Sequence, residues 1–199
     1  MSIPQESGEA AVDAASPARP GGVRRLTRYA AAFGGVAAAI TLLLSEHWYR
    51  GVEAVVTGDT VSKWLGFPVI VSRAQQTMFF AFRGTGPSHM LGLQITLGCS
   101  SVLLLAPILL LTGVLLSLRN VSPLRVLFAA AIAGSLVVFI NVVRLVMIAA
   151  MVDWWGVAAG FGWGHTLFGS VLMLLGLAAA LGSFVLVLGY RGRGRVRAT

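Results

Sequence analysis

The sequence predicts an all-α polytopic membrane protein with four transmembrane helices, both termini inside the cell, and a small β-like segment outside. Hydrophobic residues make up 57% of the chain, and the mean hydropathy is +0.84. Charged residues make up 11%, whereas a globular domain usually carries about 25%. The few charges separate long apolar stretches, which is the pattern of helices that face lipid.

The composition also excludes several other classes of protein. The 199 residues carry a net charge of +8, but the basic residues stand beside apolar spans and form no basic stripe. We therefore expect a lipid bilayer around the chain and no nucleic acid as a partner. Cys99 is the only cysteine, which excludes an intrachain disulfide framework and a cysteine-rich zinc site. Only three dispersed histidines accompany it, so no metal and no cofactor are expected.

The N-terminal region divides into a tail and a first membrane helix. Residues 1–28 are rich in Ala, Ser, Pro and Gly, and are expected to form a disordered, basic cytoplasmic tail. The apolar stretch 29–48 is long for the core of a signal peptide, and Ser45–Trp48 is a poor cleavage site. This stretch is therefore interpreted as an uncleaved helix that begins a membrane domain over residues 29–188.

The segment 49–98 differs from the rest of that domain, because it contains prolines, scattered charges and β-type runs. Phe67–Val71, Thr77–Phe82 and Met90–Thr96 are expected to be short strands, with a turn at residues 84–87. Irregular backbone cannot face lipid, because its polar groups would have no partners there. The segment is therefore placed outside the bilayer.

Three further apolar stretches predict the second, third and fourth helices, at about residues 99–118, 124–152 and 165–188. Each is close to or longer than the roughly 20 residues that cross a bilayer core. Pro107 predicts a kink in the second helix. Residues 119–123 are expected to be a tight turn and residues 153–164 a Trp- and Gly-rich loop. Residues 189–199 are expected to be a basic cytoplasmic tail.

The distribution of basic residues predicts the orientation of the helices. With the N-terminus inside, the inner regions hold most of the Lys and Arg residues: Arg19, Arg24, Arg25, Arg28, Arg119, Arg125, Arg191, Arg193, Arg195 and Arg197. The outer regions hold only Arg50, Lys63, Arg73 and Arg83. All five tryptophans fall on the outer side, as expected for an interfacial belt.

Polar residues within the apolar stretches point to a functional site. Arg144 is the only charge of the third helix, and Asn141 lies three residues before it, on the same helix face. An ionisable group inside a membrane span costs at least ~2.5 kcal/mol and usually has a function. Counted from the inner basic residues at about 1.5 Å per residue, Cys99, Arg144 and His165 all lie near the outer interface. Three different helices can therefore bring these side chains together.

This combination of residues suits thiol chemistry. A helix N-terminus and a nearby arginine both favour the thiolate of Cys99, and a histidine can act as its base or as an acid toward a leaving amine. Arg144 could instead stabilise an oxyanion. Structural roles stay open for each residue: Cys99 as a small buried apolar side chain, His165 as a helix cap, and Arg144 as a snorkelling or ion-paired side chain.

Three short segments in this order resemble the exosortase/archaeosortase family of membrane transpeptidases. Leu97–Ser101 is similar to the family's Cys-Ser-Gly segment and contains Cys99 and Ser100, although Ser101 stands where Gly is typical. Asn141–Leu145 is similar to its Asn-x-x-Arg segment, and His165–Gly169 to its His segment. The resemblance covers about residues 60–188, and four helices make this a compact form.

The resemblance implies an outward-facing site with catalytic Cys99, Arg144 and His165, supported by Asn141 and Ser100. It implies cleavage of exported proteins whose C-terminal sorting signal comprises a short motif, a membrane helix and a basic tail. Cys99 would form the acyl-enzyme, which then passes to an amine or to water. The expected location is the plasma or inner membrane, with the site on the extracytoplasmic side.

Two other functions remain open at this point. A small channel or transporter subunit, or an assembly factor, would use Arg144 and Asn141 to line a polar path, and Cys99 would then be dispensable. A serine intramembrane protease would use Ser100 or Ser101, but no glycine motif around these serines and no Asp–His pair accompanies them.

Overall fold

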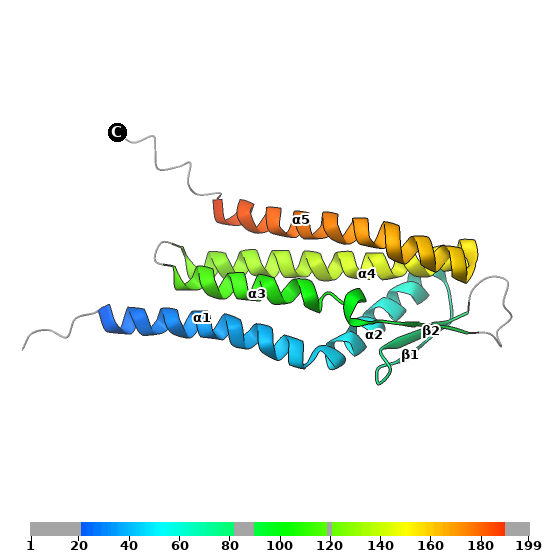
Figure 1. Ribbon diagram of the computed structural model, residues 1–199, viewed down its shortest axis with the longest axis horizontal. Coiled ribbons are helices and arrows are strands. Elements are labelled where there is room, and N and C mark those ends of the chain that lie inside the picture. The colour runs from blue at the N-terminus through cyan, green and yellow to red at the C-terminus, as the bar shows by residue number, and fades with distance from the viewer. Residues whose placement is uncertain (1–20, 82–89, 119–120, 190–199) are drawn as a thin grey trace, which may run out of the picture.

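The computed structural model describes residues 21–81, 90–118 and 121–189, and it is mostly helical. Its elements along the chain are α1 (Gly21–Leu44), α2 (Glu46–Leu65), β1 (Val69–Ser72), β2 (Thr77–Phe80), β3 (Leu91–Gln94), η1 (Leu97–Cys99), α3 (Val102–Ser117), α4 (Pro123–Phe161), η2 (Gly162–Phe168) and α5 (Gly169–Gly189). The molecule is elongated, with α1, α3, α4 and α5 along its length and the strands at one end (Figure 1). Residues 1–20 and 190–199 of the expected tails, the turn at 84–87 and residues 119–120 lie outside the described part of the chain.

The first helix differs from the one expected at residues 29–48. It begins at Gly21, so residues 21–28 are helical and not part of a disordered tail, and it ends at Leu44. Ser45 follows, and its hydroxyl donates to the carbonyl of Thr41 at 2.6 Å. Such a back-bonded serine bends a helix, and α2 leaves α1 at an angle of 70°. Residues 49–65 of α2 belong to the segment that was expected to lie outside the bilayer, where no helix was expected, whereas residues 46–48 were expected to end the first helix.

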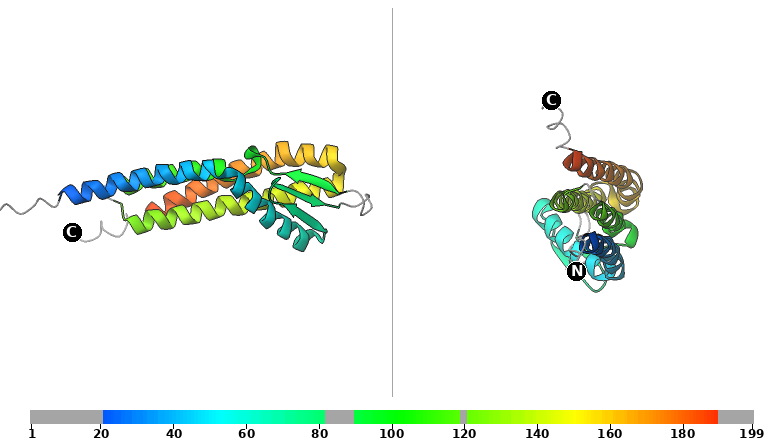
Figure 2. Two further views of the ribbon diagram at one scale, coloured as in Figure 1. Left: turned by 90° about the horizontal axis from the view of Figure 1, so that it is seen from below. Right: turned by 90° about the vertical axis from the view of Figure 1, so that its left-hand side faces the viewer.

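The three expected strands are present, and each strand begins and ends within two residues of its expected range. They form an antiparallel sheet in the order β1-β2-β3, with Val69 paired to Phe80 and Phe80 paired to Leu91. Met78 and Phe80 are fully buried. They pack in one core with apolar residues of α2 and of the far part of α4: Val61, Ile148, Ala149 and Val152. Seen from below, the sheet and α2 lie together beside this part of α4 (Figure 2).

The second helix begins later than expected. Residues 97–99 form the short 3-10 helix η1, Ser100 is extended (φ −92°, ψ 149°), and α3 begins at Val102. Pro107 lies inside α3. Further along, α3 packs closely against α1. A Cβ added to Gly35 of α1 would lie 2.5 Å from the Gly113 Cα of α3. Close packing of small residues of this kind is common between membrane helices.

The expected loop at residues 153–164 is helical except for one reversal. Gly156 has φ 78° and ψ 171°, and the chain turns back there from α4 toward α5. A Cβ on Gly160 would lie 2.2 Å from the carbonyl oxygen of Met151, so the returning backbone packs directly on α4. The small residues of this region allow a tight helical hairpin, which needs no long loop. α4 and α5 then run side by side (Figure 1).

The exterior of the bundle is apolar. Among the described residues, one helical run, Pro123–Gly189, is long and apolar enough to cross a membrane, and only 17% of its most apolar window is buried. The bent pair α1–α2 adds a second span if it is counted as one, whereas α3 is apolar but shorter than that test requires. By length and hydropathy, the described residues therefore contain one or two candidate spans, and the four expected spans are not confirmed. A core of small and apolar residues joins α3, α4 and α5: Ile108, Ala129, Ala133, Val137, Ala180 and Phe184.

Candidate active site

Cys99 is held where the bundle meets the sheet. It is the last residue of η1, is 6% exposed, and packs with Ala54, Ile95 and Leu145 from three different elements or connections. Its backbone N–H donates to the carbonyl of Thr96 at 3.0 Å. The expectation that Cys99 begins the long helix is wrong, because Ser100 is extended and separates it from α3.

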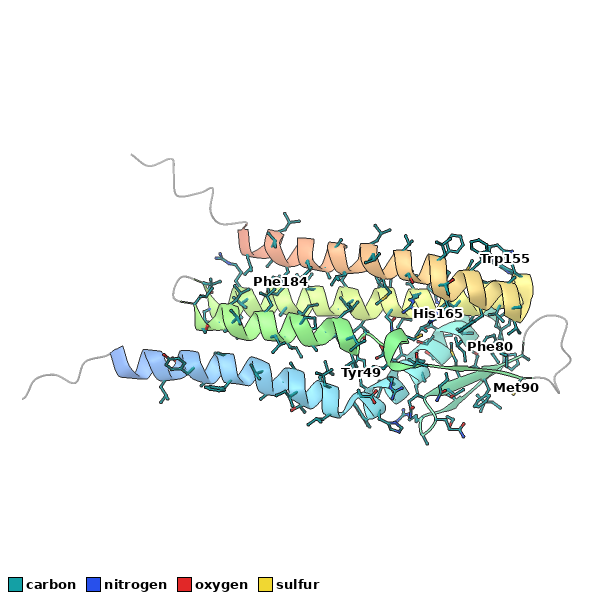
Figure 3. All side chains as sticks on the ribbon, in the orientation of Figure 1. Tyr49, Phe80, Met90, Trp155, His165 and Phe184 are labelled. Atoms are coloured by element: carbon teal, nitrogen blue, oxygen red, sulfur yellow. The ribbon has the colours of Figure 1, made fainter. Side chains whose placement is uncertain are left out.

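His165 approaches Cys99 from the other side of the site. The Cys99 Sγ atom lies 3.1 Å from His165 Nε2, across 66 residues of sequence. The imidazole stacks on Phe161, with ring centroids 5.1 Å apart and an angle of 16° between the planes. Figure 3 shows His165 near the junction between the bundle and the sheet, far from Phe184. His165 lies within the π-helix η2, whereas it was expected to start a helix.

Arg144 lies on α4 and is 4% exposed. Its buried Nε has no hydrogen-bond partner among the described residues, and its charge acts on the His165 imidazole. Gly169 makes room for it, since a Cβ there would lie 2.8 Å from Arg144 Nε. A pocket of about 370 Å³ opens beside Arg144, lined also by Gly98, Ser100 and Leu177. A buried guanidinium with a free N–H beside a pocket is suited to bind an oxygen that gains negative charge.

Asn141, one turn before Arg144, ties the cysteine segment to α4. It is fully buried, and its Nδ2 donates to the carbonyl of Cys99 at 2.9 Å and to Glu53 Oε1 at 3.0 Å. Both partners are acceptors, which fixes the orientation of the amide. Asn141 and Arg144 lie on one helix face, as their spacing predicted, and Asn141 contacts the backbone of the cysteine segment.

Glu53 is the site residue that the sequence did not identify. It lies on α2, is 4% exposed, and accepts hydrogen bonds from Ser100 Oγ at 2.5 Å, Ser101 N at 3.0 Å and Ser101 Oγ at 2.7 Å. Ser100, expected to support Cys99, therefore contacts Glu53. The sequence signal was a single carboxylate inside the apolar run Val52–Val56. It had little meaning while the segment was not expected to be a helix packed on the site.

Tyr49, one turn before Glu53 on α2, completes this polar network. Its hydroxyl lies 2.9 Å from Ser101 Oγ. Burial raises the pKa of the Tyr49 phenol above its ordinary value of 10, and the negative charge of Glu53 adds to the rise. The phenol is therefore neutral at physiological pH and available as a donor to Ser101.

The structure thus brings Cys99 into contact with His165 and places Arg144 next to Gly169, where its charge acts on the His165 imidazole. Within residues 21–81, 90–118 and 121–189, no group of three or more His, Cys, Asp or Glu side chains is arranged to hold a metal ion. The polar groups of the site instead suit acyl transfer on a thiol: a nucleophile, a base or acid in contact with it, and a buried cation.

Comparison with known proteins identifies the family. The sequence model of the transmembrane exosortases matches residues 21–182, from the start of α1 into α5, and so includes all the residues of this site. No curated protein and no solved structure matches the chain. The family match covers most of the chain and confirms the resemblance to the exosortase family. The chain is a membrane protein and belongs to the transmembrane exosortase family.

Proposed function

We propose that this protein is a membrane cysteine transpeptidase that cleaves the C-terminal sorting signals of exported proteins through an acyl-enzyme on Cys99. The observation that carries the proposal is the 3.1 Å contact between Cys99 Sγ and His165 Nε2, together with a buried Arg144 whose charge acts on the imidazole. A thiol in contact with an imidazole can pass its proton to Nε2, which gives the reactive thiolate. The membership of the exosortase family supports the same reaction class.

The proposed topology has four membrane-crossing arms with both termini inside. The arms are α1, α3, the long part of α4 before Gly156, and α5; the run Pro123–Gly189 contributes two of them because it reverses at Gly156. Basic residues then flank the inner ends, where they count most. The sheet and α2 lie on the outer side, and the site faces the outer interface.

The first half-reaction uses the cysteine and histidine together. The thiolate attacks the scissile carbonyl carbon, and the carbonyl oxygen becomes an oxyanion. The protonated His165 then donates its proton to the amide nitrogen as the C–N bond breaks. The C-terminal segment leaves with a new amine, and the rest of the substrate remains on Cys99 as a thioester.

Arg144 is proposed to stabilise the oxyanion, because the nearby backbone amides are already engaged. The N–H groups of Cys99 and Ser100 donate to Thr96 and Leu97, and that of Ser101 donates to Glu53. The usual donor, an amide at or next to the nucleophile, is therefore not free. The Arg144 Nε is buried and has no partner among the described residues.

The second half-reaction regenerates the enzyme. An incoming amine or water attacks the thioester carbonyl, and the neutral His165 accepts the proton of that nucleophile. The C–S bond breaks and returns the thiolate to Cys99. The pocket between α3 and α5 extends from Arg144 and Ser100 to apolar residues such as Leu104 and Leu177. This arrangement is consistent with an apolar substrate helix lying beside the site.

The test is a chromosomal Cys99→Ala replacement in the native host, followed by mass spectrometry of the C-terminal peptides of exported, membrane-anchored proteins. We expect a set of proteins that share a motif, a membrane helix and a basic tail to remain uncut, while the variant still inserts normally. Ser117→Ala, at the opposite end of α3, is the matched control and should process its substrates normally. Full processing by Cys99→Ala would show that the thiol is structural and would favour a non-catalytic polar path through Arg144.

A further inference from the structure

Glu53 carries a buried negative charge that the proposed reaction does not use. It is 4% exposed and forms no ion pair among the described residues, where the ion pairs are Arg50–Glu46 and Lys63–Asp59. A buried carboxylate without a partner cation is costly unless hydrogen bonds satisfy it. Here three side chains and one backbone amide donate to it.

The donors of Glu53 belong to the segment that carries the nucleophile. Ser100 and Ser101 follow Cys99 directly, and both serine hydroxyls and the Ser101 N–H are bonded to the carboxylate. Asn141 extends the contact, since the same amide group that donates to Glu53 also donates to the Cys99 carbonyl. One carboxylate therefore joins α2, the cysteine segment and α4.

The hydrogen-bond donors show which of the two Glu53 carboxylate oxygens is the essential acceptor. Oε1 accepts from the Ser101 N–H and the Asn141 amide, which are donors only, and from the Ser101 hydroxyl. The Ser101 hydroxyl acts as a donor because the neutral Tyr49 phenol can donate to its oxygen. Oε2 meets only the Ser100 hydroxyl, which can donate or accept. The essential acceptor is therefore Oε1, at the full length of a glutamate side chain.

We propose that Glu53 is a positioning residue that holds the Cys99–Ser101 segment so that the Cys99 sulfur meets His165. This inference rests on the proposed function and adds to it a residue that touches neither the substrate nor the reacting atoms. The extended Ser100 breaks the helical path between η1 and α3, and such a break needs external partners for its polar groups. Glu53 supplies a partner for the Ser101 N–H and for the hydroxyls of Ser100 and Ser101.

Two conservative substitutions separate reach from charge. Glu53→Gln loses the negative charge but keeps the reach, because its amide oxygen can replace Oε1 and its NH₂ can donate to Ser100 Oγ. Glu53→Asp keeps the charge but is one methylene shorter and cannot meet all the donors. Asp59→Asn is the matched control, since it removes a carboxylate from the exposed side of the same helix.

The readout is alkylation of Cys99 by iodoacetamide at a series of pH values, on the full-length protein in lipid nanodiscs. Cys99 is the only cysteine, so every labelled molecule reports this site. The ionisable groups around it are His165 on η2, Arg144 on α4, and Glu53 and Tyr49 on α2. A merely structural role of Glu53 would change the yield or the melting temperature but not the pH midpoint of alkylation in the folded protein.

We expect Glu53→Asp to raise the midpoint relative to the wild-type protein, because the sulfur loses its imidazole partner. Turnover should fall about 10²-fold with KM unchanged, as for a nucleophile displaced by about 1 Å. Glu53→Gln and Asp59→Asn should stay close to wild type in both measurements. If Gln shifts the midpoint and Asp does not, the charge matters and positioning is wrong; if neither variant shifts it, Glu53 has no influence on Cys99.

The wild-type protein and His165→Ala distinguish this inference from the proposed function itself. If the midpoint is the same in the wild-type protein and in His165→Ala, Cys99 and His165 do not form a thiolate–imidazole pair. That result would contradict the proposed reaction itself. If the midpoint changes in His165→Ala but not in Glu53→Asp, only the positioning role of Glu53 is contradicted.

Discussion

Arg144 and Glu53 are two buried side chains of opposite charge that make no ion pair with each other. Glu53 is saturated by hydrogen-bond donors, whereas the Arg144 Nε has none of the described residues as a partner. If the two formed a salt bridge, neither would be available for another task. Their separation leaves a polarised site: a carboxylate that holds the backbone after Cys99, and a guanidinium that faces a pocket.

At the residue scale, Arg144→Lys keeps the charge and loses the planar, delocalised donor fork. We expect substrate cleavage to fall about 10²–10³-fold, the usual loss when one oxyanion donor is removed. Arg73→Lys, in the exposed turn after β1, should leave cleavage unchanged. Cleavage is measured by mass spectrometry of a reporter with a C-terminal sorting signal; a wild-type rate in Arg144→Lys would show that positive charge alone suffices.

At the scale of elements, the π-helix η2 decides which way His165 faces. Its seven residues, Gly162–Phe168, continue without a break into α5. A π segment shifts the register of the side chains around the helix axis and is often found at functional sites. Gly164 and Gly169 lie at this segment, and Gly169 faces Arg144. Gly160 and Gly164 lie in the expected Gly-rich loop, but here they allow close helix packing, whereas a Cβ on Gly162 would meet nothing within 4 Å.

Gly169→Ala tests this packing. The added Cβ would lie 2.7 Å from the Gly164 carbonyl oxygen and 2.8 Å from Arg144 Nε, so the backbone of η2 or the guanidinium must move. We expect a loss of about 1–3 kcal/mol in stability, as for overpacking, together with reduced cleavage. Gly182→Ala is the control on the same helix, since its Cβ meets nothing within 4 Å. Thermal melting in detergent and the cleavage assay would contradict the assignment if the two variants behaved alike.

At the scale of the whole molecule, the apolar exterior and the position of the sheet indicate how the protein sits in the membrane. Large apolar side chains are exposed along α1, α4 and α5, including Phe33, Phe128 and Leu174. The ends of α3 and α5 and the start of α1 gather at one end of the molecule, and the sheet lies at the other (Figure 1). Trp154 and Trp155 lie beside the Gly156 reversal, and Figure 3 shows Trp155 at the sheet-bearing end.

This arrangement predicts opposite labelling of two engineered cysteines in the Cys99→Ala background. Ala74→Cys, in the exposed turn between β1 and β2, should react with a membrane-impermeant maleimide added to intact cells. Ser117→Cys, at the end of α3, should react only after permeabilisation. The reverse pattern would invert the proposed topology, and labelling of both from outside would contradict a membrane crossing by α3.

The sequence by itself determined the membrane character, the family and the three strands, and it predicted Cys99, Arg144 and His165 as the site residues. These follow from apolar composition, from local β patterns and from side-chain types that are rare in apolar stretches. The roles of these residues in catalysis stay predictions until the variants are measured. The spacing of Asn141 and Arg144 fixed their shared helix face, because helical geometry is local.

Only the tertiary structure decided the rest, because it depends on contacts between distant segments. It placed Glu53 against Ser100 and Ser101 through an α2 helix that the sequence pattern did not reveal. The residues after Asp153, which were expected to be a loop, form a helical hairpin that reverses at Gly156. His165 contacts Cys99 from within a π-helix. A local pattern reports which side chains a segment offers. The partner that satisfies a buried charge or a broken helix is set by the packing of segments 47 to 88 residues apart, which no local pattern encodes.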